Sequence, residues 1–125
     1  MIDKYTKYLC IVFIGVLASM STFSTENIQY KNLIQEVVLS DNVEATKFLI
    51  KRGANVNFKY KYNHTLLHSA ALYGNLEMVE TLVQSGALLS KNDFGLSAID
   101  SAKDMNNSDV VEFLIRYYDN LDRIY

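Results

Sequence analysis

The sequence predicts an all-α fold in which pairs of short helices stack into a solenoid. Three observations support this prediction: the chain repeats itself about every 33 residues, each copy carries apolar residues at helical spacing, and the 125 residues include no proline to interrupt a helix. One pair of helices cannot bury its own apolar face, so neighbouring copies have to stack on one another. The length leaves room for a single domain.

The repeat is visible in the segment GANVN at 53–57, which recurs as GALLS at 86–90 after an offset of 33 residues. A third copy follows the second at an offset of 32 residues, where 97–100 falls on 65–68. The predicted repeats cover about residues 30–58, 59–91 and 92–118.

Taken in order, the first helix is expected to carry an apolar face made by Tyr30, Leu33, Ile34, Val37 and Val38, with Ser24 or Thr25 as its cap. In the second repeat, Thr65 is the expected N-cap of a helix over 65–73. Gly74 and Gly86 are expected just past helix ends, where a left-handed backbone is usually required.

The other copies carry Asp41 and Asn106 in the place of Gly74, and both residue types tolerate that conformation. In the place of Gly86 the last copy has Tyr118, so its final helix is expected to run on, or to end irregularly, through 117–118. The same copy has Lys103 and Asp104 where the second has Ala71 and Leu72, which is typical of the wetter outer face of a terminal repeat.

The composition excludes several classes of protein. Half of the residues are hydrophobic and 21% are charged, which is unlike a disordered chain. The net charge of −2 provides no overall positive field for nucleic acid or an anionic membrane. The single cysteine allows neither an intramolecular disulfide nor a cysteine-based zinc site.

Residues 1–21 have the order of a signal peptide. Lys4 and Lys7 precede an uncharged run at 9–20, and small or hydroxylated residues follow it. Cleavage is expected before Thr22 or, at the latest, after residue 24, which leaves the repeat domain at 25–125. The run is shorter than the roughly 20 residues of a membrane span. We therefore expect export, to a periplasm or out of the cell, with no stable span after cleavage; an uncleaved anchor over 8–23 remains the alternative.

The segment TLLHSAALYGNLEMVETLVQSGA at 65–87 resembles the ankyrin repeat, whose pattern is TPLHxAAxxGxxxxVxxLLxxGA. Leu66 replaces the proline of that pattern. Residues 33–57 resemble a first repeat with an eroded front turn, and 92–117 a third, with Ser97 for Thr and Asp100 for His. The resemblance implies two antiparallel helices per repeat, finger-like β-turns between repeats, a concave binding face and, as a rule, no catalysis.

The resemblance also implies which positions grip a partner: the finger tips, the last positions of each first helix, and the residue before the second glycine. In the second copy these are Lys61, Tyr62, His64, Leu72, Tyr73 and Ser85; in the third Asp93, Phe94, Leu96, Asp104, Met105 and Tyr117; in the first Leu39, Ser40 and Arg52. Seven of them, Tyr62, Leu72, Tyr73, Phe94, Leu96, Met105 and Tyr117, would form one apolar patch if they converge. The alternative is that several are buried against a neighbouring repeat.

Two local patterns have competing interpretations. Residues 59–62 alternate lysine and tyrosine, a pattern that suits single-stranded nucleic acid, but the net acidity and the expected export favour a protein partner. His64 and His68 are four residues apart and could share a metal on a helix, but no further ligand stands at suitable spacing. The resemblance implies instead that His68 links neighbouring turns by hydrogen bonds.

No phosphate-binding loop, serine elbow or paired carboxylates are present, so no enzyme activity, metal or cofactor is expected. Glu77 and Glu80 are expected on a solvated helix face. The sequence thus predicts an exported module that binds an unknown protein through its concave face, is a monomer when free, and acts as an inhibitor, immunity or accessory factor. The alternatives are a secreted effector acting on host proteins, and an enzyme or nucleic-acid binder on a helical scaffold.

Overall fold

The computed structural model describes residues 32–124, with side chains to residue 123. The predicted signal segment, the expected caps Ser24 and Thr25, and Tyr30 lie outside the described residues. In chain order the elements are a helix over 32–39, α3 (Val43–Lys51), the short 3₁₀ turn η1 (Lys61–Asn63), α4 (Leu66–Tyr73), α5 (Leu76–Gln84), α6 (Ala98–Asp104) and α7 (Ser108–Ile124).

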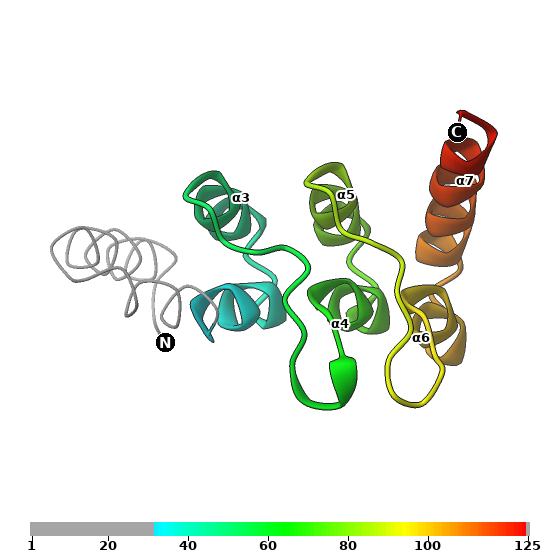
Figure 1. Cartoon of the computed structure of the whole chain (residues 1–125), viewed down its shortest axis with the longest axis horizontal. Helices are drawn as coiled ribbons and strands as arrows, with labels where there is room; N and C mark the ends of the chain where they lie inside the picture. The colour runs from blue at the N-terminus through cyan, green and yellow to red at the C-terminus, as the bar shows by residue number, and fades with distance from the viewer. Residues whose placement is uncertain (1–31, 125) are drawn as a thin grey trace, which may run out of the picture.

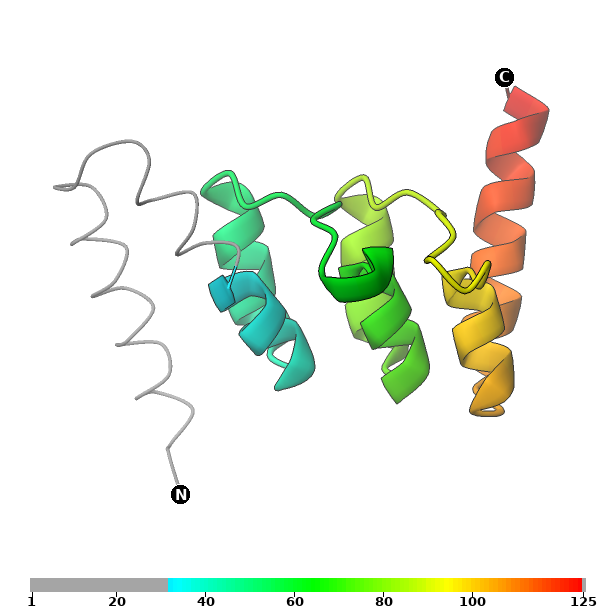
Figure 2. The same ribbon diagram turned by 60° about the horizontal axis from the view of Figure 1, so that its bottom comes forward.

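The helices form two layers, and the predicted all-α stack is confirmed. The helix over 32–39, α4 and α6 make one layer, and α3, α5 and α7 make the other (Figure 1). The loops between repeats extend past the first layer as fingers, and Figure 2 shows the helix pairs side by side along the long axis. Among residues 32–124 the sole β-type pairing is an isolated antiparallel bridge between Lys59 and Thr65.

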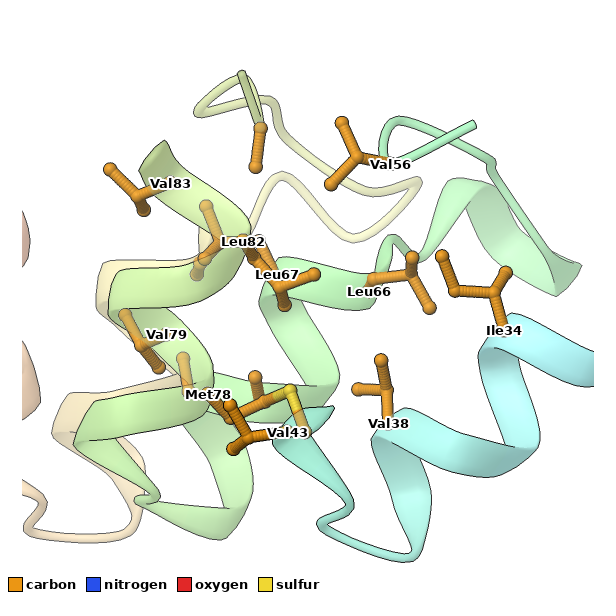
Figure 3. Close-up of a cluster of buried hydrophobic side chains, with 14 of the residues drawn as sticks. Ile34, Val38, Val43, Val56, Leu66, Leu67, Met78, Val79, Leu82 and Val83 are labelled. Atoms are coloured by element: carbon orange, nitrogen blue, oxygen red, sulfur yellow. The ribbon is translucent and has the colours of Figure 1, made fainter. Parts of the chain in front are cut away.

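The core lies between the two layers and continues from one repeat to the next. Side chains from both helices of the second repeat, including Leu67, Met78 and Leu82, are fully buried (Figure 3). Ile34 of the first repeat and Leu114 of the third extend the same cluster. Because each repeat is covered by its neighbours, the stack rather than any single repeat is the unit of stability.

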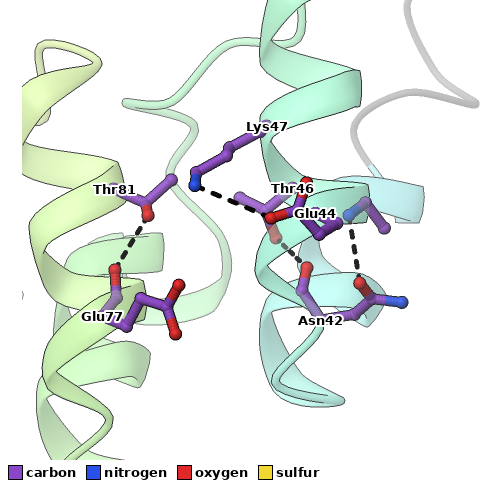
Figure 4. Close-up of polar contacts among 7 residues, drawn as sticks. Asn42, Glu44, Thr46, Lys47, Glu77 and Thr81 are labelled. Atoms are coloured by element: carbon purple, nitrogen blue, oxygen red, sulfur yellow. Dashed lines mark hydrogen bonds and ion pairs between the residues drawn. The ribbon is translucent and has the colours of Figure 1, made fainter.

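Side-chain caps fix where the helices begin. Asn42 precedes α3, and its side-chain oxygen accepts a hydrogen bond from the backbone N–H of Ala45 (3.0 Å). One turn later the hydroxyl of the buried Thr46 donates to the Asn42 carbonyl (2.9 Å), and Glu44 and Lys47 lie 3.8 Å apart on the outer face (Figure 4). Such caps satisfy backbone groups that a helix end leaves unpaired.

The first helices of the second and third repeats begin with capping boxes. The Thr65 hydroxyl accepts from the His68 backbone N–H, and the His68 ring accepts in return from the Thr65 N–H. Ser97 and Asp100 form the same reciprocal pair at the start of α6. These hydrogen bonds, first from the Ser97 backbone and then from its hydroxyl, hold the pKa of Asp100 below its ordinary value.

A side chain of the third repeat closes the carboxyl end of α4. The Asn107 amide donates to the carbonyls of Ala71 (2.9 Å) and Leu72 (3.1 Å), two acceptors that a helix end leaves without intrahelical partners. Gly74 lies beneath this amide in the left-handed region, with φ +76°. The turn between α4 and α5 is therefore shaped by its own backbone and by the next repeat together.

The last helix continues past 117–118 and ends at Ile124, which agrees with the first of the two expectations for Tyr118, that the helix runs on rather than ends irregularly. The Tyr118 hydroxyl donates to the Ala87 carbonyl (2.6 Å) in the loop after α5, which ties the extended helix to the second repeat. Burial, followed by the neighbouring Tyr117, raises the pKa of Tyr118 to about 12.

Candidate protein-binding surface

Two fingers stand next to each other on the side of the first helices. In the first, the Tyr60 N–H donates to the His64 carbonyl (2.8 Å), closing the loop around η1. In the second, the Asn92 N–H donates to the Leu96 carbonyl (2.9 Å). The Asn92 side chain accepts from the backbone N–H groups of Phe94 (3.0 Å) and Leu96 (3.1 Å). Each tip is thus held by local hydrogen bonds.

The two fingertips are also bound to each other. The Asp93 backbone N–H donates to the Tyr62 carbonyl (2.9 Å), and the Asn63 amide donates to the Asp93 carboxylate (2.7 Å). The hydrogen bonds join residues about one repeat apart in the chain. They give the paired fingertips a fixed relative position, which lowers the entropy cost of binding a partner.

The fingertip ledge, as we call Lys61, Tyr62 and Phe94, is exposed and apolar at its centre. The rings of Tyr62 and Phe94 lie 5.4 Å apart, centroid to centroid, with a tilt of 51°. Tyr62 is 51% exposed and Phe94 is 68% exposed. The Lys61 ammonium lies 5.0 Å from the centroid of the Tyr62 ring. Tyrosine is enriched among the residues that contribute most to binding at protein interfaces, and a cation beside an aromatic ring is attracted to it.

Tyr62 occupies a backbone conformation that large side chains seldom adopt. Its φ is +62° and ψ +27°, and Asn63 next to it also has a positive φ of +55°. A left-handed residue other than glycine costs about 1–2 kcal/mol. Strain of this kind gathers at functional positions, so its presence beneath an exposed ring supports a binding role for the ledge.

This strain can be measured with two substitutions at one position. Tyr62→Gly removes both the ring and the steric penalty, whereas Tyr62→Ala removes the ring alone. We expect the glycine variant to be more stable than the alanine variant by about 1 kcal/mol. Urea denaturation followed by circular dichroism measures the difference. Equal stabilities would show that the turn relaxes and that Tyr62 stores no strain.

His68 lies at the base of the first finger and is fully buried. The Thr65 N–H points at the Nδ1 atom of His68 (3.3 Å), so this nitrogen is the acceptor. The Nε2 atom then carries the proton and donates to the Leu96 carbonyl (2.9 Å) of the second finger. The side chain therefore connects the start of α4 with the neighbouring finger.

His64 packs on this group from the finger side. Its ring centroid lies 4.8 Å from that of His68 and 6.4 Å from that of Tyr60. Burial, with a smaller contribution from His68, lowers the pKa of His64 below its ordinary value. Both nitrogens of His68 are already engaged, so a metal shared with His64 would require His68 to give up a hydrogen bond.

The structure distributes the predicted contact residues over separate places. Tyr62 and Phe94 meet at the fingertips, with Leu96 nearby in the second finger. Tyr73 and Met105 are exposed, together with Leu39, at the turns inside the repeats. Tyr73 is the last residue of α4, and an eight-residue helix spans about 12 Å, so it lies at the opposite end of that helix from the finger. The seven apolar residues therefore do not form one continuous patch.

The other predicted positions differ in exposure. His64, Leu72 and Tyr117 are half-buried, whereas Leu39, Ser40, Arg52, Lys61, Ser85, Asp93 and Asp104 are exposed. Tyr117 packs against the rings of Phe113 (6.0 Å) and Tyr118 (5.3 Å). On the outer layer Glu77 is exposed and Glu80 is half-buried.

The asparagines that link neighbouring repeats were not among the predicted residues. Asn107 bonds to the end of α4, Asn63 to the second fingertip, and Asn57 to the Gly86 carbonyl (3.0 Å) and the Leu88 N–H (2.8 Å). For Asn107 a signal was present, because asparagine recurs at 42, 75 and 107, once in each repeat. Asn63 has no counterpart in the other copies, and no sequence pattern marks it.

A family model described as ankyrin repeats (three copies) matches residues 26–124. The chain belongs to the ankyrin-repeat family. This assignment agrees with the helix pairs and fingers described above, and ankyrin repeats form protein–protein interaction modules. Within residues 32–124, no helix is sufficiently long and apolar to span a bilayer, and no group of three or more His, Cys, Asp or Glu side chains is placed to bind a metal ion.

Three ankyrin relatives illustrate the range of proteins that this chain resembles. It is 33% identical to a Fowlpox virus protein named as an ankyrin repeat protein, over 78% of this chain. It is 30% identical to a fem-1 homolog A-like protein of Mus musculus over 58%, and 33% identical to an alpha-latrotoxin of Latrodectus geometricus over 62%. The chain spans only 15%, 11% and 6% of the lengths of these proteins.

Proposed function

We propose that this chain is a non-enzymatic binding module that grips one partner protein through its fingers and the adjoining first helices. The observation that carries the proposal is the fingertip ledge, where Tyr62 and Phe94 are exposed, in contact, and fixed by hydrogen bonds between the two fingers. Aromatic side chains in such rigid settings supply large contact area at low entropy cost.

The outer layer offers a less favourable surface for a partner. Glu77 on α5 and Glu112 on α7 are exposed and charged, which suits contact with water. Truncating an exposed charge changes binding little, whereas truncating a central aromatic residue changes it greatly. Substitutions on the finger side are therefore expected to weaken binding strongly, and substitutions on the outer layer are expected to change it little.

The first test is the affinity for a partner copurified with the full chain. We expect Tyr62→Ala to weaken binding by about 2 kcal/mol or more, which is roughly thirtyfold in the dissociation constant. Glu77→Ala on the outer layer is the matched control and should change binding by less than about 0.5 kcal/mol. Calorimetric titration measures both, and melting curves show that each variant is folded. A partner that depends on Glu77 and ignores Tyr62 would place the binding site on the outer layer.

We further propose that the module acts after export, in a periplasm or outside the cell. Lys4, Lys7 and the uncharged run at 9–20 support this proposal. There the chain would block or shield its partner, as an inhibitor, immunity or accessory factor does. An effector directed at host proteins would use the same surface.

Export has a direct chemical test. Intact-mass analysis of the protein from the cell envelope or the medium is expected to show a chain that begins at Thr22 or Thr25. Replacing Lys4 and Lys7 by glutamate is expected to reduce processing, because the basic region before the apolar run directs export. A protein that still begins at Met1 and sediments with membranes would contradict cleavage and support the uncleaved anchor.

A further inference from the structure

Charge is unevenly distributed along the chain. Residues 45–76 contain five basic side chains and no acidic one, whereas residues 77–125 contain nine acidic and four basic. The net charge of −2 conceals this division. Two of the five basic residues, Lys59 and Lys61, belong to the first finger and are exposed.

The finger lysines have no ion-pair partner in the described part of the chain. The salt bridges there join Lys47 with Glu44 and Arg116 with Glu112, on helices of the outer layer. Asp93 is the acidic residue of the fingertips, and its carboxylate is bonded to the Asn63 amide. The neutral amide does not cancel the charge of Asp93, but the two lysines outnumber this single carboxylate, so positive charge is in excess beside the two exposed rings.

We propose that the segment bound at the fingertip ledge is an acidic stretch of polypeptide. Its carboxylates would lie against Lys59 and Lys61, and its apolar or aromatic side chains would cover Tyr62 and Phe94. This inference rests on the proposed function and adds the chemistry of the partner. Complementary charge contributes to the choice of partner and to the rate of association, while the rings supply the buried area.

A nucleic acid would also offer negative charge, but two observations favour a peptide. The rings of Tyr62 and Phe94 lie 5.4 Å apart with a tilt of 51°, so they do not offer the parallel faces on which successive bases of a single strand would stack. The remainder of the chain is acidic and repels an extended polyanion. A short acidic segment needs contact with the fingers alone.

The test uses fluorescein-labelled peptides of equal length in which tyrosine alternates with glutamate, glutamine or lysine, and a thymidine oligonucleotide. Fluorescence anisotropy with the full chain is expected to show binding of the glutamate peptide at least about tenfold tighter than the glutamine peptide, declining with added salt. The lysine peptide is expected to bind weakest. If the negative net charge of the whole chain decided binding, this basic peptide would instead bind tightest.

Two double variants locate the charge that matters. Replacing Lys59 and Lys61 by glutamine is expected to weaken binding of the glutamate peptide about tenfold. Replacing Lys47 and Lys51 by glutamine makes the same change in net charge on α3 and is expected to alter binding less than about twofold. Circular dichroism confirms that both are folded.

The outcomes separate this inference from the proposed function. Equal binding of the glutamate and glutamine peptides, with loss in Tyr62→Ala, would overturn the acidic partner and leave the ledge as a binding site. Tighter binding of the oligonucleotide that depends on Lys59 and Lys61 would overturn it in favour of nucleic acid. No measurable binding of any peptide would also overturn it, while the copurified partner would still test the proposed function.

Discussion

Gly74→Ala is expected to lower the free energy of unfolding by about 3 kcal/mol. The backbone of Gly74 is left-handed, which costs a residue with a side chain about 1–2 kcal/mol. A Cβ atom would also lie 2.7 Å from the Cγ and Oδ1 atoms of Asn107. The asparagine would have to move and would lose its hydrogen bonds to the end of α4, at about 1 kcal/mol each.

Gly86→Ala provides the matched control. Gly86 also has a positive φ, +94°, but no heavy atom lies within 4 Å of a Cβ built there. The Gly86→Ala variant should therefore lose only the free energy of the backbone strain, about 1–2 kcal/mol. The midpoint of urea unfolding, at an unchanged slope, measures both variants. Equal losses would mean that the contact between repeats at Asn107 contributes nothing to stability.

His68→Ala is expected to be nearly as damaging, with a loss of about 3 kcal/mol. The substitution leaves the Thr65 N–H without its partner, removes one of the two donors to the Leu96 carbonyl, and opens a cavity where a fully buried ring stood. His64→Ala is the control, because His64 is half-buried and its ring packs on His68 but takes part in neither of these hydrogen bonds. It should cost about 1 kcal/mol.

A chelator distinguishes this structural role from a shared metal. Melting of the unmodified protein is expected to be unchanged by EDTA, because His68 already uses both ring nitrogens in hydrogen bonds. A lower melting temperature after chelation, restored by added zinc, would show that His64 and His68 hold a metal and that the ring nitrogens are arranged differently.

The parts of the fold that could be predicted are those fixed by local chemistry. Thr65 stands before an apolar helical pattern. The replacement of a glycine by Tyr118 predicted that the last helix would run on or end irregularly through 117–118, and the helix in fact continues to Ile124. The helical spacing of the apolar residues and the repeat length together define which helix faces are buried. The stacking of helix pairs could therefore be predicted from the sequence.

The site was predicted less completely, because it depends on how loops fold. The alternation of lysine and tyrosine at 59–62 drew attention to the finger, but the contact of Tyr62 with Phe94 arises from hydrogen bonds between two loops. The left-handed backbone of Tyr62 has no sequence signal, since glycine or asparagine is the residue type expected there. Tyr73 was placed with the fingers by family position, although the length of α4 separates them.

The hydrogen bonds of Asn107 also affect the order in which the repeats unfold. When the third repeat detaches, the carbonyls of Ala71 and Leu72 lose the donor that closes α4, so fraying of the carboxyl-terminal repeat weakens the repeat before it. In a linear array, such a penalty at the junction suppresses half-opened states and makes neighbouring units melt together. The amides at the end of α4 should then exchange with solvent deuterium at the rate of the third repeat, although they belong to the second.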